Sequence, residues 1–340
     1  MTGARVVRMT LGACAALLVA AAPAAAQSPT PTPTPAPPVP TPTPAPAPVT
    51  AELTAGTTTG FNDGKRVLVL RGDRVKVTGI LNPYVAGQKV VVRVKQSRKV
   101  LARRAVAITP AASGLGSYAT RLRLRRPGTL TIQVSHAATP QLAASRAGNV
   151  RLLVVRPRLP FGARGALLDL FQRQLRALRY PVERTGTYDA RTGRAVMAWR
   201  KVNRRARLET ADEGVIRAVL KGQGAWKVRH PRAGHHVEAD ISLQALALID
   251  GDRVVKVYPT SSGAPATPTI LGRFRFYLKT PGTNSVGMVD SNYFIRGYAI
   301  HGYPSVPPFN ASHGCLRVPI PDARNIFNWI RIGDRIFVEA

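Results

Sequence analysis

Hydrophobic residues recur at every second position in several short runs between residues 51 and 157, and Gly, Pro, Asn or Ser separate the runs. Side chains two positions apart lie on the same face of a strand, so each run predicts a half-buried β-strand. Six or seven short strands at this spacing are typical of an immunoglobulin-like β-sandwich, which we expect over residues 51–157. The expected inward positions are Val75, Val77, Val90, Val92, Val94, Leu122, Leu124, Leu130, Ile132 and Val134.

Helical spacing replaces this alternation over residues 158–224, and three apolar stripes predict a three-helix module. The third helix is expected to begin at Thr210, whose hydroxyl can cap it while Glu213 returns a bond, and to end at Gly222. The stripes consist of Leu167, Leu168, Phe171, Leu175 and Leu178; of Ala195, Val196, Trp199 and Val202; and of Val215, Ile216, Val219 and Leu220.

Strand patterns return over residues 235–340, with a late helix beginning near Pro321 and a closing strand at 335–338. In the first of these strands, alternation places His236, Glu238 and Asp240 on the outer face. Together with His230 and His235 they could form a metal cluster, but we expect a solvated strand edge there.

The N-terminal region predicts export. Two arginines precede the apolar run Met9–Ala22, and small residues follow at 24–26, so residues 1–26 are interpreted as a cleaved signal peptide. A lipoprotein signal around Cys14 is the less favoured alternative. Residues 27–50 are rich in Pro, Thr and Ala and predict a disordered linker of polyproline II type, roughly 60 Å long. No later apolar segment is long enough to predict a transmembrane helix in the mature chain.

The charge of the chain is strongly positive, with 49 Lys and Arg against 17 Asp and Glu, which gives a net charge of +32 over 340 residues. Nucleic acid, an anionic membrane and anionic cell-wall polymers are therefore candidate partners. Residues 51–157 carry 19 basic and 3 acidic residues, 158–232 carry 18 and 6, and 236–340 carry 10 and 8. Export and the lack of basic residues interleaved with aromatic ones argue against nucleic acid.

One strand contributes a row of arginines, Arg121, Arg123 and Arg125, on the face opposite its inward leucines. This row could bind anions, or it could be an ordinary solvated outer face.

The chain contains only two cysteines, Cys14 and Cys315, which excludes a disulfide-rich fold. After signal cleavage Cys315 would remain unpaired, and an odd cysteine in an exported protein indicates a reactive thiol. A free thiol is only a few per cent ionised at neutral pH, so a nucleophilic cysteine needs a base or a cation nearby. His301 and His313 stand on either side of a loop long enough to fold back and supply that base.

Two further residues near Cys315 suit acyl-transfer chemistry. Gly314 lets the backbone turn tightly so that N–H groups can face an oxyanion, and Arg317 could hold a substrate carboxylate. Two alternatives remain open: an inert buried thiol, and a catalytic zinc held by His301, His313 and Cys315.

The run His301-Gly302 followed by Ser312-His313-Gly314-Cys315-Leu316-Arg317 resembles the signature of the L,D-transpeptidase catalytic domain. Residues 237–244, Gly251, Ser262-Gly263 and Thr267-Pro268-Thr269 resemble the opening strands and turn of that family. The resemblance implies a mixed β-sandwich with short helices over residues 235–340.

The same resemblance assigns roles to individual residues. It implies that Cys315 is the nucleophile, that His301 is the proton donor and acceptor, and that the carbonyl of Gly302 orients His301. Ser312 and His313 would shape the site, and the amides of His313, Gly314 and Cys315 would stabilise the oxyanion.

Residues from Gly165 through Phe171-Gln172, Tyr180 and Gly186-Thr187-Tyr188-Asp189 to Trp199 resemble the peptidoglycan-binding-domain-1 family. The two resemblances together imply an enzyme of cell-wall biogenesis and cell shape.

The expected reaction forms 3→3 cross-links through a thioester and releases D-alanine, with no metal or organic cofactor. The expected partners are peptidoglycan stem peptides, glycan and anionic cell-wall polymers, and the expected state is an exported monomer. The alternatives are an L,D-carboxypeptidase or other thiol peptidase, a non-catalytic wall-binding protein and, from charge alone, a nucleic-acid binder.

Overall fold

The structure is a computed structural model that describes residues 46–64 and 66–340. The proposed signal peptide, and the part of the proposed linker that precedes residue 46, lie outside the described residues. Within the described part of the chain, no helix has both the length and the apolar character needed to cross a membrane.

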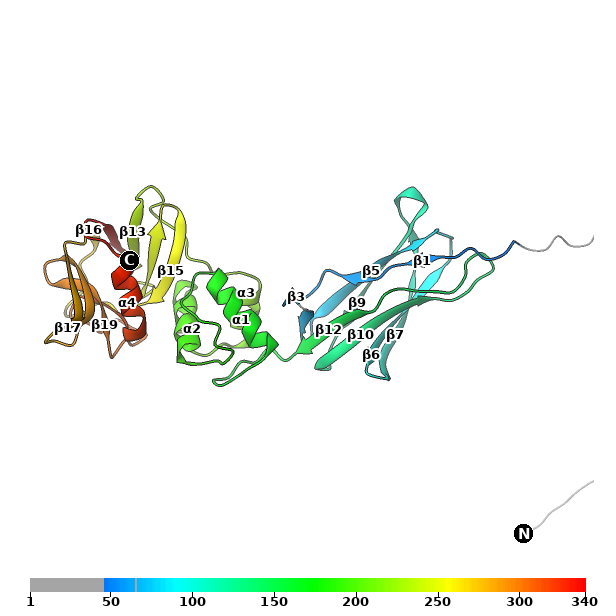
Figure 1. Cartoon of the computed structure of the whole chain (residues 1–340), viewed down its shortest axis with the longest axis horizontal. Coiled ribbons are helices and arrows are strands. Elements are labelled where there is room, and N and C mark those ends of the chain that lie inside the picture. Colours follow the sequence, from blue (N-terminus) through cyan, green and yellow to red (C-terminus); the bar gives the residue numbers. More distant parts are fainter. Residues whose placement is uncertain (1–45, 65) are drawn as a thin grey trace, which may run out of the picture. The chain divides into compact units, whose positions relative to one another are not determined.

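Residues 49–155 form two sheets (Figure 1). The side chains between the sheets form one hydrophobic core. The first sheet has the order β1-β5-β9-β8, with β2 also paired to β5, and the second has the order β3-β4-β12-β10-β6-β7, with β11 also paired to β10. The strands of the first sheet are β1 (Glu52–Leu53), β2 (Gly56–Thr57), β5 (Arg74–Asn82), β8 (Thr109–Pro110) and β9 (Gly116–Arg123). Those of the second are β3 (Phe61–Asn62), β4 (Val67–Leu70), β6 (Lys89–Gln96), β7 (Lys99–Ala107), β10 (Gly128–His136), β11 (Ser145–Arg146) and β12 (Val150–Val155).

Every position that alternation placed inward in these strands is buried, from Val75 to Val134. A single 3-10 turn, Ala112–Gly114, precedes β9. The assignment of this region to the immunoglobulin-like class stays a prediction.

Three helices follow, α1 (Ala166–Ala177), α2 (Ala190–Val202) and α3 (Glu213–Leu220). The expected cap of the third helix is wrong: the Asp212 carboxylate, not the Thr210 hydroxyl, accepts the hydrogen bond from the backbone N–H of Val215. Aspartate is an equally good capping residue, and it stands directly before the first helical residue. Gly222 follows the helix with a φ of +70°, which a residue without Cβ adopts at little cost.

Residues 235–339 form two mixed sheets and one helix. The larger sheet has the order β15-β14-β13-β21-β16 and the smaller one the order β17-β18-β19-β20, with parallel pairs at β13–β21 and β19–β20. The elements are β13 (His235–Asp240), β14 (Ala245–Asp250), β15 (Arg253–Pro259), β16 (Gly272–Arg275), β17 (Leu278–Thr283), β18 (Val289–Ile295), β19 (Tyr298–Tyr303), β20 (Leu316–Pro319), α4 (Ile320–Trp329) and β21 (Arg335–Glu339).

The expected late helix and closing strand are both present, as α4 with Pro321 in its first turn and as β21. Helix α4 packs on β18, β19 and β20, and its residues Ala323 and Ile326 enter the core of this region.

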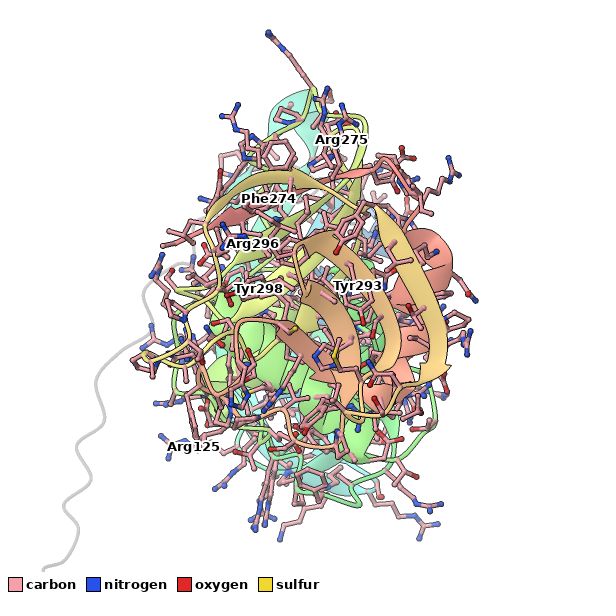
Figure 2. All side chains as sticks on the ribbon, turned by 90° about the vertical axis from the view of Figure 1, so that its left-hand side faces the viewer. Arg125, Phe274, Arg275, Tyr293, Arg296 and Tyr298 are labelled. Atoms are coloured by element: carbon pink, nitrogen blue, oxygen red, sulfur yellow. The ribbon has the colours of Figure 1, made fainter. Side chains whose placement is uncertain are left out.

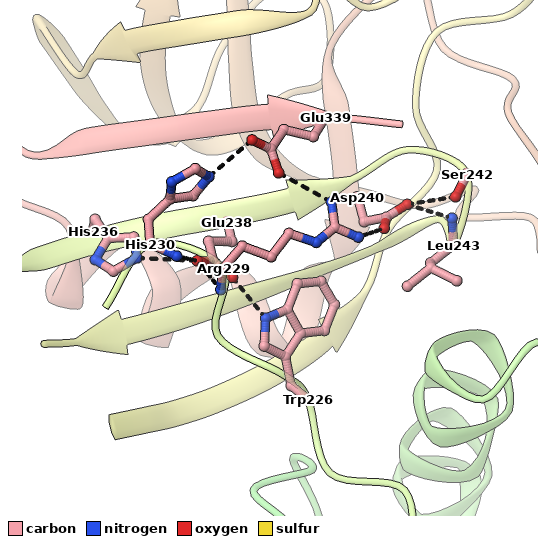
Figure 3. A network of polar contacts seen from close by, with 9 residues as sticks. All are labelled: Trp226, Arg229, His230, His236, Glu238, Asp240, Ser242, Leu243 and Glu339. Carbon is pink, nitrogen blue, oxygen red and sulfur yellow. Dashed lines mark hydrogen bonds and ion pairs between the residues drawn. The ribbon is translucent and has the colours of Figure 1, made fainter. Parts of the chain in front are cut away.

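The solvated edge expected at His236, Glu238 and Asp240 is wrong, because β13 is the central strand of its sheet and all three side chains are buried. Glu238 is 2% exposed and accepts hydrogen bonds from Trp226 Nε1 at 2.9 Å and from the backbone N–H of His230 at 2.7 Å (Figure 3). Burial raises the pKa of Glu238, but these and further hydrogen bonds outweigh it and hold the pKa below its usual value. The segment that enters the sheet therefore covers the outer face of β13.

The buried carboxylate of Asp240 also has hydrogen-bond and ion-pair partners (Figure 3). It accepts from Ser242 Oγ at 2.7 Å and from the Leu243 N–H at 2.8 Å, and it forms an ion pair with Arg229. Alternation alone could not reveal this, because it says which face a residue occupies and not what covers that face.

Candidate active site

The loop that carries Cys315 is tied to the residues that follow β15. Ser262 O accepts hydrogen bonds from the N–H groups of Ala311, at 2.8 Å, and Ser312, at 2.9 Å. In return Ser312 O accepts from the Ala264 N–H at 2.8 Å and from Thr267 Oγ1 at 3.0 Å. These bonds hold the backbone immediately before the cysteine from both sides.

Thr269 adds a second anchor. Its hydroxyl donates to Gly314 O at 2.8 Å and accepts from the Gly263 N–H at 2.8 Å. A Cβ at Gly263 would overlap the backbone of Thr267 and Thr269, so the turn can close on the loop only because residue 263 is glycine. The Ser-Gly and Thr-Pro-Thr segments therefore hold the cysteine loop in place.

Ser312 closes the loop on itself. Its hydroxyl donates to Cys315 O at 2.6 Å and accepts from the Gly314 N–H at 3.1 Å. Gly314 has a φ of +109°, and a Cβ there would overlap the ring of Tyr298. Of the three amides expected to face an oxyanion, that of Gly314 is therefore engaged by Ser312.

His301 lies in β19 and is 3% exposed. Its Nδ1 lies 2.9 Å from Gly302 O. A carbonyl oxygen only accepts, so Nδ1 carries the hydrogen and Nε2 is left as a proton acceptor. Gly302 lies under α4, where a Cβ would come within 2.7 Å of the Ala323 Cβ.

Cys315 lies directly before β20, which pairs in parallel with β19 so that His301 is opposite Arg317. The charge of Arg317 acts on both the His301 imidazole and the Cys315 thiol, so the three side chains lie near one another at this strand pair. The Cys315 thiol is free and partly exposed, and its Sγ lies 3.7 Å from Gly297 O in the turn between β18 and β19. The fold thus brings together His301 and Cys315, the base and nucleophile predicted from the sequence, which lie 14 positions apart in the chain.

The pKa values of the two groups shift in opposite directions. Burial raises the pKa of the Cys315 thiol. A backbone hydrogen bond with Ala299 and the charge of Arg317 lower it, but by less. Burial, aided by the Arg317 charge, lowers the pKa of the His301 imidazole against its bond to Gly302 O. The resting site thus favours a neutral thiol and a neutral imidazole, and the thiol proton must move during attack.

Arg317 is held over the Tyr303 ring, with its guanidinium carbon 4.2 Å from the ring centroid, and its Nη1 donates to Ala311 O at 3.3 Å. His301 meets the same tyrosine ring edge-on at 5.7 Å between centroids. The side chain of His313 is exposed, in contrast to that of His301. Among the described residues no three His, Cys, Asp or Glu side chains are grouped to hold a metal ion, so the zinc set considered from the sequence does not form.

Four contributors to this site were missed by the sequence reasoning. Tyr298, the first residue of β19 (labelled in Figure 2), packs on Gly314. The carbonyl of Gly297, in the turn that precedes β19, faces the thiol. Lys201 of α2 donates to Thr260 O at 2.8 Å, and Thr260 Oγ1 donates to Arg317 O at 2.8 Å. No local pattern marks these residues, because their roles depend on segments distant in sequence.

Residues 234–338 match the family model of the YkuD L,D-transpeptidase catalytic domain. The match covers both mixed sheets, α4, His301 and Cys315. Residues 234–338 are thus similar to L,D-transpeptidase catalytic domains.

Several solved structures are similar to the chain. An L,D-transpeptidase from Xylanimonas cellulosilytica is 29% identical, with a TM-score of 0.49, over 54% of this chain and 98% of that one. An L,D-transpeptidase from Stackebrandtia nassauensis is 16% identical, with a TM-score of 0.35, over 53% and 94%. One from Mycobacterium smegmatis is 13% identical, with a TM-score of 0.29, over 85% and 100%. No curated protein matches the chain.

Proposed function

We propose that this chain is an exported cysteine L,D-transpeptidase that forms 3→3 cross-links in peptidoglycan. The observation that carries the proposal is the pairing of β19 with β20 within the L,D-transpeptidase catalytic domain, which brings a proton-accepting imidazole and a free thiol near one another. Neither group needs a metal or an organic cofactor for acyl transfer.

In the first half-reaction, His301 Nε2 accepts the thiol proton as Cys315 Sγ attacks the carbonyl that precedes the terminal D-alanine of a stem peptide. The tetrahedral oxyanion meets the N–H groups of His313 and Cys315, since that of Gly314 donates to Ser312. Collapse forms the thioester, and the imidazolium returns its proton to the leaving amine of D-alanine.

In the second half-reaction, a side-chain amine of a neighbouring stem attacks the thioester. Its proton passes to His301, the new amide forms, and the thiolate is released and reprotonated. Arg317, fixed over Tyr303, holds a carboxylate of the donor stem.

The test is the intact mass of the purified mature protein after incubation with a carbapenem. The wild type should gain one adduct, and Cys315→Ala should gain none, because the variant lacks the attacking sulfur. An adduct formed by Cys315→Ala at the wild-type rate would contradict the assignment of the nucleophile.

His301→Ala and His313→Ala form a matched pair in the same assay. Loss of a general base costs about 100-fold or more, so His301→Ala should acylate at least that much more slowly, whereas His313→Ala should lose far less. The reverse order would move the base to His313.

Product analysis with purified stem peptides then distinguishes a transpeptidase from a carboxypeptidase, because cross-linked dimers arise only if an amine, and not water, resolves the thioester.

A further inference from the structure

The first pair of sheets contains a cavity of about 390 Å³ between β7, the last strand of the seven-stranded sheet, and the end of β9. One wall is formed by residues 101–104 of β7, and the other by residues 121–126, which end β9 and turn into β10. Val94 and Leu130 contribute to an apolar, buried floor. We call this cavity the arginine groove.

Its walls carry an unusual concentration of positive charge. The guanidinium groups belong to Arg103, Arg104, Arg121, Arg123, Arg125 and Arg126. No Asp or Glu lines the groove, and among the described residues none of these six arginines forms a salt bridge. Residues 51–157 contain only three acidic side chains, so the positive potential of the groove is left almost uncompensated.

Two of the arginines are already oriented by the protein. Arg104 Nη1 donates to Thr120 Oγ1 and to Arg121 O, both at 3.1 Å, and so spans the gap between the two sheets. Arg123 Nε donates to Gly72 O at 3.1 Å. Each keeps further N–H donors, and fixing these side chains in advance lowers the entropy lost on binding.

We propose that the arginine groove is a binding site for an anionic polymer whose repeating charges are phosphodiesters. The planar, forked donors of guanidinium match phosphate oxygens, and charges along both walls suit a chain of successive anions better than a single ion. The site is independent of Cys315 and goes beyond the transpeptidase reaction.

The apolar floor favours a polymer over a membrane as the occupant. Peripheral attachment to a bilayer uses exposed apolar side chains that enter the headgroup region. Here Leu122, Leu124 and Leu130 are at most 8% exposed and lie at the bottom of the cavity, where they cannot reach a bilayer.

The test measures binding of the full mature chain to fluorescently labelled poly(glycerol phosphate) at about 0.15 M salt. The groove variant is Arg121→Gln, Arg125→Gln and Arg126→Gln together, because these side chains are exposed (Arg125 is labelled in Figure 2) and none donates a hydrogen bond within the described protein. Losing three such contacts should weaken binding about tenfold or more.

The matched control removes the same charge from the same domain outside the groove, as Arg98→Gln, Arg146→Gln and Arg151→Gln. Its affinity should fall less than about threefold, through the reduced net charge alone. An equal loss in both variants would overturn the proposal, since binding would then follow total charge.

A second groove variant, Arg121→Lys, Arg125→Lys and Arg126→Lys together, keeps the charge and removes the forked donors. It should bind with intermediate affinity, whereas wild-type affinity would contradict recognition through guanidinium groups. Circular dichroism and the unfolding midpoint verify that each variant is folded.

Two further probes identify the source of the anion. Phosphatidylglycerol vesicles and polyglutamate of equal charge should both compete weakly with poly(glycerol phosphate). Vesicle binding that depends on the groove, without polymer binding, would assign the groove to a membrane, and equal binding of polyglutamate would remove the preference for phosphate. Acylation of Cys315 is also measured in the groove variant. A failure of polymer binding can then be distinguished from a failure of the proposed enzymatic activity.

Discussion

At the scale of single residues, the site depends on three glycines whose missing side chains make room for particular neighbours. Gly314 admits the Tyr298 ring, Gly302 lets α4 approach β19, and Gly263 lets the Thr-Pro-Thr turn close on the cysteine loop. A Cβ at any of them forces its neighbours apart, which for a packed backbone costs about 1–3 kcal/mol. The glycines thus fix the loop that presents the thiol.

Arg317 is the residue whose charge should be visible in the pH profile. Its guanidinium lowers the pKa of both Cys315 and His301. Arg317→Gln should therefore raise the apparent thiol pKa, measured as the pH dependence of alkylation by iodoacetamide, and slow alkylation at neutral pH. The acid limb of the pH profile of carbapenem acylation should also move to higher pH, because His301 would stay protonated up to a higher pH.

Arg331→Gln is the matched control, since Arg331 is exposed and its charge does not contribute to either shift. Its profiles should overlay those of the wild type. A downward or absent shift in Arg317→Gln would show that Arg317 does not set the electrostatics of the site.

At the scale of elements, α2 contributes directly to the scaffold behind the cysteine. Lys201 is 2% exposed and donates to Thr260 O at 2.8 Å, and Thr260 Oγ1 in turn donates to the carbonyl of Arg317 in β20. The helices also share a hydrophobic core with β14 and β15, through Ala245, Ala247 and Val257. The helical segment therefore supports the catalytic domain mechanically.

Burial of Lys201 should appear as a pH-dependent stability. Burial, together with the charge of Arg207, lowers its pKa from 10.5 to about 7. Between these two pH values, Lys201 carries a proton in the unfolded chain but not in the folded protein. The free energy of unfolding therefore rises as the pH increases across this window, and it falls again as the pH decreases to 7. Lys201→Met should abolish this slope, which is at most about 1.4 kcal/mol per pH unit for one group.

The measurement is urea unfolding, followed by tryptophan fluorescence, at several values between pH 7 and pH 10. Lys221→Met is the control, because Lys221 is exposed at the end of α3 and should leave the slope unchanged. An identical pH dependence for Lys201→Met and the wild type would mean that Lys201 titrates normally in the fold.

At the scale of the whole molecule, the excess of basic residues lies outside the region that carries the thiol and the imidazole. Residues 236–340, which include the thiol and imidazole, carry 10 basic and 8 acidic residues, whereas residues 51–232 carry 37 and 9. A nearly neutral catalytic domain thus follows strongly cationic segments. This distribution suits the proposed role, in which an anionic polymer holds the enzyme while its site accepts a peptide.

Binding of the mature chain to purified cell wall should therefore weaken steeply as salt rises from about 0.05 to 0.5 M, because exposed charges are screened over shorter distances. Acylation of Cys315 by a carbapenem over the same range should change little and serves as the control. Wall affinity that does not respond to salt would show that the cationic segments do not hold the protein on the wall.

Local patterns identified the buried positions of single strands and helices, although they placed the cap of α3 at Thr210 and not at Asp212. The alternation at Val90, Val92 and Val94 and the stripe at Leu167, Leu168 and Phe171 correctly named buried positions, because periods of 2 and 3.6 follow from backbone geometry alone. The larger error arose where a distant segment decided the environment of a side chain. Glu238 was expected in solvent, and only the covering by residues 226–230 buries it.

By itself, the sequence determined the order of the elements and the segregation of charge, and it supplied the proposed reacting groups, since each is a property of neighbouring residues. Only the tertiary structure decided which groups meet. The parallel pairing of β19 and β20 brings His301 and Cys315 near one another, and the Ser312 hydroxyl engages one of the three expected oxyanion donors. Strand pairing and packing join segments far apart in the chain, and no local period encodes them.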